Sequence, residues 1–266
     1  MTISSGVRTA YLPQAPDPAP GLRLFCFHHA GGVASSFADW PRRLRSRAAV
    51  VPVQLPGRER RIDEPRIRDL DRLLGELADE LDGWLRPPFA LYGHSMGALV
   101  AYTLAQRLHR AGRPMPERLL LGGYPAPHRP HALADAYRLD DAALARNLIE
   151  LGDISPALRR YPAWLNAAVA LVRDDLALCD SYRPGAGEPL PCPIDVFTGE
   201  SDPLMRPLDA EEWDRHTTRD CTVHVIPGGH FFPWDSASLF LDRIDGVLAG
   251  APRARPSSAA EPEPVG

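Results

Sequence analysis

A serine on a glycine-flanked turn is the feature that most constrains how this chain can fold. Residues 93–97 read Gly-His-Ser-Met-Gly, a G-x-S-x-G pattern in which the serine hydroxyl is exposed on a sharp bend. The apolar run before it, 89–92, is typical of a short buried strand, and apolar residues recur at helical spacing after it. Strand, turn and helix together favour a catalytic role for Ser95 over a serine that only caps a helix.

Strand and helix patterns alternate on both sides of this turn. The expected strands lie at 22–27, 48–53, 89–92, 118–123, 193–198 and 222–226. The expected helices lie at 37–44, 69–85, 96–110, 209–216 and 236–248. Repeated strand–helix–strand order predicts an α/β fold with a mostly parallel sheet flanked by helices.

The alternation stops between residues 126 and 191, where helical patterns are punctuated by proline and glycine and no strand pattern is convincing. An insertion of this length between sheet strands predicts a helical lid. The core then comprises 21–125 and 192–249. We expect residues 1–20, rich in proline and small side chains, to form an irregular arm. We expect 250–266, composed of alanine, proline and charged residues, to be a disordered tail.

Composition excludes several function classes. The 266 residues contain no lysine, which rules out a phosphate-loop lysine, a Schiff-base lysine and a serine–lysine dyad. A formal net charge of -4 gives no general electrostatic reason to expect a nucleic-acid or membrane partner. The longest charge-free run, 87–106, holds two prolines and two glycines, so a catalytic turn explains it better than a membrane span.

The four cysteines are scattered without metal-ligand spacing, and no signal peptide is recognisable at the N-terminus. Reduced thiols in a cytoplasmic protein are the simplest interpretation. We expect no metal and no cofactor in the protein itself, and we expect a monomer.

A serine nucleophile needs an imidazole base, which a carboxylate orients. In this topology the order is serine, acid, histidine, each after a strand. Asp202 follows the strand at 193–198, and His230 follows the strand at 222–226, so we assign Asp202 as the acid and His230 as the base. Glu200 shares the loop with Asp202 and remains the alternative acid.

Other titratable residues near these motifs have simpler interpretations. Asp195 and His224 lie inside expected strands and are interpreted as structural. His216 stands at a polar helix end, where we expect it to be solvated. His94 flanks the nucleophile but is expected to point away along the turn, as a packed or partly exposed histidine.

Two backbone N–H groups are expected to stabilise the developing oxyanion. One belongs to the residue after the serine, Met96, and the other to the loop after the first strand, at Ala30. The glycines of this loop, 28–32, let the backbone approach a substrate. A metal site on His28 and His29 is disfavoured, because adjacent side chains leaving one strand point in opposite directions.

Five segments together resemble the type II thioesterases of polyketide and nonribosomal peptide assembly lines. They are 29–32 (H-A-G-G), 54–59 (Q-L-P-G-R-E), 93–98 (G-H-S-M-G-A), 202–203 (D-P) and 227–232 (P-G-G-H-F-F). The resemblance covers residues 22 to about 248, and the Q-L-P-G-R-E segment is the most diagnostic because ordinary esterases lack it. Two departures are His28, where the family commonly has proline, and Asp153, which interrupts a usual double glycine.

The resemblance implies an α/β-hydrolase fold with a helical lid, in which Ser95, Asp202 and His230 form the triad and Ala30 and Met96 the oxyanion hole. It implies hydrolysis of acyl groups carried on the phosphopantetheine arm of acyl or peptidyl carrier proteins. Such enzymes clear stalled or mis-primed chains.

Two features of the partner and substrate follow as expectations. Five residues of the lid could line an acyl chamber or simply pack its helices: Trp164, Leu165, Leu171, Val172 and Leu176. Carrier proteins are usually acidic, so arginine clusters could form the docking surface. These are Arg42, Arg43, Arg45, Arg47, Arg58, Arg60 and Arg61.

The main alternative function is that of a serine esterase or acyltransferase of the same fold acting on a free small molecule. A third is a catalytically silent binding protein of this fold, which the complete set of serine, acid and histidine argues against.

Overall fold

The computed structural model describes residues 9–14, 16, 21–46, 48–185 and 187–250. The irregular arm expected at 1–20 lies partly outside the described residues. The disordered tail expected at 250–266 lies outside them except for Gly250. None of the described helices is long and apolar enough to cross a bilayer.

Six parallel strands form one sheet in the order β2-β1-β3-β4-β5-β6. The strands are β1 (Arg23–Phe27), β2 (Ala49–Pro52), β3 (Phe89–His94), β4 (Arg118–Gly122), β5 (Ile194–Gly199) and β6 (Cys221–Ile226). The predicted mostly parallel sheet is therefore confirmed.

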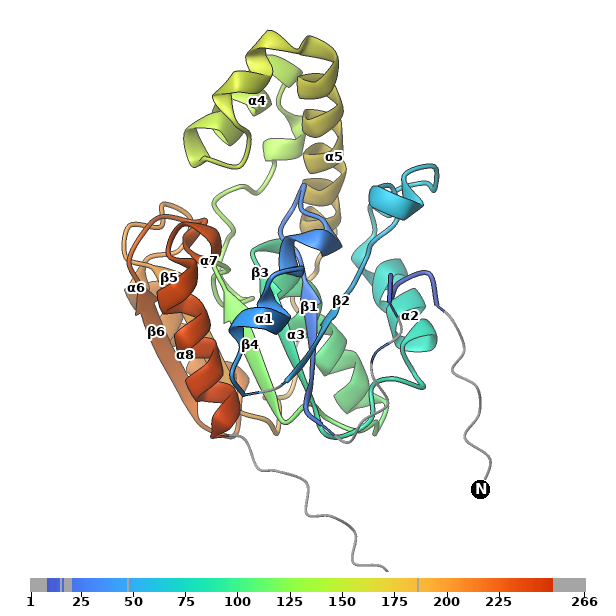
Figure 1. Ribbon diagram of the computed structural model, residues 1–266, viewed down its shortest axis with the longest axis vertical. Helices are drawn as coiled ribbons and strands as arrows, with labels where there is room; N and C mark the ends of the chain where they lie inside the picture. The colour runs from blue at the N-terminus through green and yellow to red at the C-terminus, as the bar shows by residue number, and fades with distance from the viewer. Residues whose placement is uncertain (1–8, 15, 17–20, 47, 186, 251–266) are drawn as a thin grey trace, which may run out of the picture.

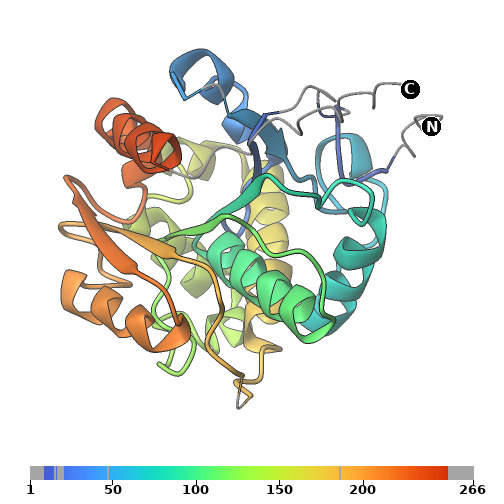
Figure 2. The ribbon, with the colours of Figure 1, turned by 90° about the horizontal axis from the view of Figure 1, so that it is seen from below.

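Alternating side chains of the strands enter two separate hydrophobic cores. In β1, Phe25 and Phe27 face one core and Leu24 and Cys26 face the other, as the two-residue period of a strand requires. The first core lies against α2 (Leu70–Glu80) and α3 (Met96–Arg110), and the second against α1 (Trp40–Arg43) and α8 (Ala237–Ala249). Figure 2 shows the two helical layers on opposite sides of the sheet.

Two predicted helices are shorter in the structure. The segment predicted as helix 37–44 is a 3-10 turn, η1 (Ala34–Phe37), followed by the four-residue α1. The segment predicted as helix 69–85 ends as α2 at Glu80, because Gly83 and the approaching prolines at 87–88 disfavour helix. Leu81 and Leu85 remain buried in the turns that follow, so the apolar face continues beyond the helix.

The last third of the chain adds shorter elements around β5 and β6. They are α6 (Pro207–Ala210), η5 (Glu211–His216) and α7 (Phe232–Asp235). The helix predicted at 209–216 is thus split between α6 and a 3-10 helix, and α7 was not predicted.

The described helices between residues 126 and 191 lie over one edge of the sheet. The described elements are η3 (Ala136–Arg138), α4 (Asp141–Leu151), η4 (Pro156–Arg160) and α5 (Pro162–Asp180). The side chain of Asp140 caps α4 by accepting from the Ala143 N–H at 2.7 Å, and Gly152 ends α4 with a φ of 89°. The two helices share a third hydrophobic cluster of their own. In Figure 1 they stand above the sheet.

Candidate active site

The turn after β3 holds Ser95 in a strained backbone conformation. Its φ of 54° and ψ of -120° are unusual for a residue with a side chain, and such strain costs on the order of 1–3 kcal/mol. The Ser95 N–H donates to the Gly122 carbonyl at 2.7 Å. A Cβ on Gly93 would lie 1.9 Å from the Gly97 carbonyl oxygen, and one on Gly97 would lie 2.1 Å from that of Phe27. Both glycines of the motif are therefore required by close backbone packing.

Asp202 and His230 meet across the loops that follow β5 and β6. His230 Nδ1 donates to Asp202 Oδ2 at 2.9 Å, and Asp202 Oδ1 accepts from the Leu204 N–H at 2.8 Å. Both side chains are buried, whereas Glu200 is exposed. This geometry leaves His230 Nε2 as the free nitrogen, and the structure brings Asp202, and not Glu200, to the histidine.

Ser95 and His230 line the same cavity at the carboxyl edge of the parallel sheet, where ligands of open α/β folds usually bind. The cavity holds about 20 Å³, space for about one water molecule. The remaining lining comes from the loop after β1, from the start of α3, from residues around α4 and α5, and from the loop after β6. These residues are His29, Ala30, Met96, His131, Leu133, Leu148, Leu151, Asp153, Val172, Leu176, Cys179 and Phe231.

The two predicted oxyanion residues, Ala30 and Met96, also lie at this cavity. Met96 is the first residue of α3, where backbone N–H groups have no partner within the helix. In the part of the chain that the structure describes, neither the Ala30 nor the Met96 N–H donates to another protein atom. Both donors are thus available to a bound oxygen atom.

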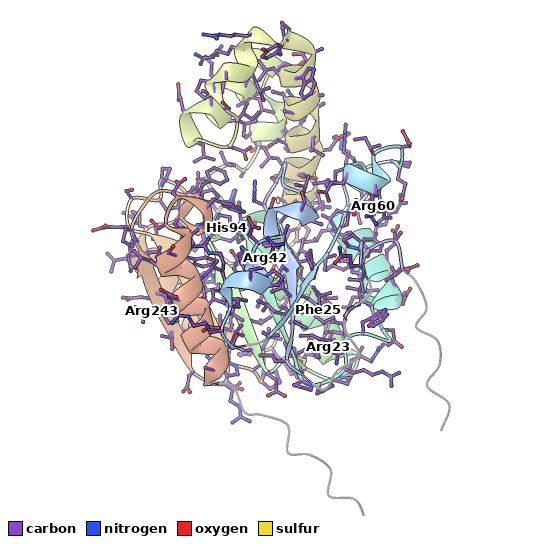
Figure 3. All side chains as sticks on the ribbon, in the orientation of Figure 1. Arg23, Phe25, Arg42, Arg60, His94 and Arg243 are labelled. Atoms are coloured by element: carbon purple, nitrogen blue, oxygen red, sulfur yellow. The ribbon has the colours of Figure 1, made fainter. Side chains whose placement is uncertain are left out.

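Neutral imidazoles surround His230. Burial, followed by the charge of His230, lowers the pKa of His29 to about 3 and that of His131 to about 4. Burial also lowers the pKa of His94 well below its usual range. His94 lies 5.0 Å from His230 between ring centroids, at the sheet edge beneath α4 and α5 (Figure 3). The interpretation of His94 as a packed histidine is confirmed, since it is fully buried and does not line the cavity, but its ring packs against His230 and does not point away from it.

The Q-L-P-G-R-E segment folds into a turn that anchors α5. Arg58 donates to both carboxylate oxygens of Asp175, at 2.7 and 2.8 Å, and both side chains are almost completely buried. Asp175 also accepts from the Gly31 N–H at 2.8 Å, and Gln54 donates to the Arg58 carbonyl at 3.0 Å. This network connects α5 to the loop that carries Ala30. The sequence interpretation missed Asp175, although a carboxylate within the apolar stripe of a helix signals a buried partner.

The arginines predicted for docking divide into two groups. Arg58 and Arg61 are buried, so the prediction that they belong to an exposed docking surface is wrong. Arg61 instead bonds to Glu64 at 2.7 Å. Arg42, Arg43, Arg45 and Arg60 are exposed, and Figure 3 labels Arg42 on α1 and Arg60 on η2 (Glu59–Arg61). Arg47 lies outside the described residues.

The five residues predicted to line an acyl chamber or to pack the lid helices lie in different surroundings. Val172 and Leu176 line the cavity, and Leu165 packs in the cluster between α4 and α5. Leu171 is partly buried and does not line the cavity. Trp164 is 72% exposed, so the option that it lines an acyl chamber is wrong.

His224 and His216 do not line the cavity. His224 Nε2 donates to Asp195 Oδ1 at 2.7 Å, in agreement with structural roles for both. His216 is not freely solvated as predicted, because it bonds to Tyr102 at 3.0 Å and to His128 at 2.9 Å. Among the described residues, no three His, Cys, Asp or Glu side chains form a metal-ligand cluster.

Known proteins are similar to this chain in sequence. Residues 22–247 match the thioesterase domain family. Gramicidin S biosynthesis protein GrsT of Aneurinibacillus migulanus is 33% identical over 236 residues, which cover 89% of this chain and 92% of the relative.

Solved structures of thioesterases are similar to this chain in fold and in sequence. RedJ, the thioesterase from the prodiginine biosynthetic pathway in Streptomyces coelicolor, is 38% identical with a TM-score of 0.81, covering 90% of this chain and 91% of RedJ. The type II thioesterase BorB from the borrelidin biosynthetic cluster is 32% identical with a TM-score of 0.79, covering 89% of this chain and 96% of BorB. The resemblance inferred from the sequence is confirmed: the chain belongs to the thioesterase domain family.

Proposed function

We propose that this thioesterase hydrolyses acyl groups from the phosphopantetheine arm of carrier proteins in polyketide or nonribosomal peptide synthesis, and so removes stalled or mis-primed chains. The observation that carries the proposal is the hydrogen bond from His230 to Asp202 beside Ser95, at one cavity of a thioesterase fold. The names of relatives from gramicidin S, prodiginine and borrelidin biosynthesis support the substrate class.

The proposed reaction uses Ser95 as nucleophile. His230 Nε2 takes the Ser95 proton while the serine oxygen bonds to the thioester carbonyl carbon. The carbon–sulfur bond then breaks, and the departing sulfur receives the proton from His230. The products of this step are an acyl ester on Ser95 and a carrier with a free thiol. Water, deprotonated by His230, next attacks the ester to release the carboxylic acid and restore the serine.

Asp202 orients His230 throughout this cycle. Because the carboxylate accepts from Nδ1, the neutral imidazole keeps Nε2 unprotonated and able to accept the serine proton. The N–H groups of Ala30 and Met96 stabilise the negative oxygen of the tetrahedral intermediate, each by about 3 kcal/mol.

The exposed arginines on and after α1 are the proposed contact with an acidic carrier protein. Arg42, Arg43 and Arg45 are all exposed and lie within four consecutive residues. Charge complementarity of this kind mainly increases the rate of encounter. Reversal of Arg42 and Arg43 to glutamate should therefore raise KM for an acyl carrier protein several-fold and leave turnover of a free acyl-pantetheine unchanged.

The test of the proposal compares one acyl group on three leaving groups: a carrier-protein thioester, a free pantetheine thioester and a matched oxygen ester. The proposal expects kcat/KM to be highest for the carrier-bound thioester and lowest for the oxygen ester. Equal turnover of all three would instead favour the alternative, an esterase or acyltransferase that acts on a free small molecule.

A further inference from the structure

A carboxyl group lies in the wall of the otherwise largely apolar active-site cavity. Asp153 follows Gly152, the residue that ends α4, and its N–H donates to the Leu148 carbonyl at 2.9 Å. The cap of α4 therefore fixes its position. Its side chain is only 7% exposed and lines the same cavity as Ser95 and His230.

The Asp153 carboxyl accepts no hydrogen bond from any residue within the described ranges. His29 Nε2 lies 3.6 Å from Asp153 Oδ1, which is too long for a hydrogen bond. His29 is also neutral, because burial lowers its pKa to about 3. The buried arginine in this region, Arg58, is already paired with Asp175. A buried carboxyl without a partner is unfavourable, so a ligand that supplied a donor would gain binding energy from it.

A second polar group at this cavity offers a donor. His131 Nδ1 accepts from the Leu133 N–H at 3.1 Å, and its pKa of about 4 keeps the ring neutral, so Nε2 carries the proton. His131 Nε2 is buried and has no partner among the described residues. Around these two groups, the helical segment contributes only apolar side chains and Cys179. A cavity built for a plain alkyl chain would need neither polar group.

We propose that the acyl groups cleaved at this site carry a hydroxyl or amino group near the thioester, which donates a hydrogen bond to Asp153. The proposal rests on the thioesterase function proposed above and narrows its substrate class. A plain alkyl chain would exclude water from Asp153 without giving its carboxyl a hydrogen-bond donor. Sites built to hydrogen-bond a substrate discriminate strongly against an analogue without the bonding group, because their polar groups are then left unpaired. His131 Nε2–H is placed to donate a hydrogen bond to an oxygen or nitrogen lone pair of the same acyl group.

Two matched sets of acyl-pantetheine thioesters test the proposal. The first compares butyryl with 3-hydroxypropionyl and 3-aminopropionyl, and the second compares isobutyryl with 2-hydroxypropionyl and 2-aminopropionyl. Within each set only one heavy atom changes. We expect kcat/KM of the wild-type enzyme to be at least about 10-fold higher for a hydroxyl or amino member than for the alkyl member in one set or both.

Two variants assign that preference to Asp153. Asp153→Leu should abolish the preference for both the hydroxyl and the amino thioesters. Asp153→Asn keeps a hydrogen-bond acceptor without the charge, so it should abolish the preference for the amino thioesters only. Glu150→Gln, on the exposed face of α4, is the control and should behave as wild type. Thermal unfolding of each variant shows that it is folded.

The outcomes separate this inference from the function on which it rests. Equal or better cleavage of the alkyl members by the wild-type enzyme, or a preference that survives in Asp153→Leu, overturns the inference and leaves the thioesterase function standing. Absence of turnover for all six thioesters contradicts both.

Discussion

Arg58 and Asp175 form a buried, bidentate ion pair between the turn after β2 and the C-terminal part of α5, with N–O distances of 2.7 and 2.8 Å. The same carboxylate holds the Gly31 N–H, next to the proposed oxyanion donor Ala30. The pair thereby joins the helical segment above the sheet to the loop that lines the active site.

Arg58→Lys should destabilise the protein by on the order of 2–4 kcal/mol, because lysine cannot reproduce the paired geometry and the buried carboxylate loses partners. Arg60→Lys is the matched control: Arg60 lies two residues along and is exposed, so its free energy of unfolding should change by less than about 0.5 kcal/mol. Urea unfolding of both variants measures the difference. Equal stability would show that the pair contributes little.

Replacement of glycine by alanine should have opposite effects on stability at two helical positions, one in the serine turn and one far from it. Gly97→Ala should destabilise the protein by more than about 3 kcal/mol or prevent folding, since the added Cβ would meet the Phe27 carbonyl oxygen at 2.1 Å. Gly246→Ala, in α8, has open space around it and should stabilise by about 0.5–1 kcal/mol. Thermal unfolding checks both, and a Gly97→Ala protein as stable as wild type would contradict the close packing of the turn.

The parallel sheet explains why much of the site could be located from the sequence. Because parallel strands end at one edge, a serine after one strand and a histidine and an aspartate after two others were expected to meet. The Arg58–Asp175 pair was not predictable in this way, since its members are far apart in sequence and belong to a loop and a helix. Periodicity also overestimated the helix at 69–85, because Leu81 and Leu85 keep the apolar pattern after the backbone has left the helix.

Two carboxylates in one loop should differ in their effect on catalysis. Asp202→Asn removes the charge that orients His230 and should lower kcat by roughly 10⁴-fold, as in related serine triads. Glu200→Gln should leave kcat within about 2-fold, because Glu200 is exposed and makes no contact with His230. Steady-state kinetics on one acyl-pantetheine measure both. A large loss in Glu200→Gln with little in Asp202→Asn would reverse the assignment of the acid.

Asp153 should make stability depend on pH. Burial, and then repulsion from Asp175, raise its pKa from 3.8 to about 7 in the folded protein. The folded state therefore binds this proton more tightly than the unfolded state, and the carboxyl destabilises the fold increasingly from about pH 4 to pH 7, with no further change above that. Of the groups around it, His29 stays neutral throughout, because burial lowers its pKa to about 3.

Asp153→Asn should accordingly gain stability over wild type as the pH rises, by roughly 1–3 kcal/mol between pH 5 and pH 8. Urea unfolding at four pH values measures the gain, with the exposed Glu150→Gln as the control that should show a flat difference. A gain that is constant over this range, or that falls with pH, would contradict the raised pKa.

The acyl-enzyme on Ser95 tests the proposed function most directly. The protein is mixed with a carrier protein that is loaded with an acyl group, and the reaction is quenched within one turnover and analysed by mass spectrometry. A Ser95→Ala variant is treated in the same way. We predict a mass increase equal to the acyl group on the wild-type peptide that contains Ser95, no increase in the variant, and a loss of hydrolysis in the variant of roughly 10³-fold or more. Hydrolysis by Ser95→Ala at the wild-type rate, or an acyl group attached elsewhere in both proteins, would contradict the account.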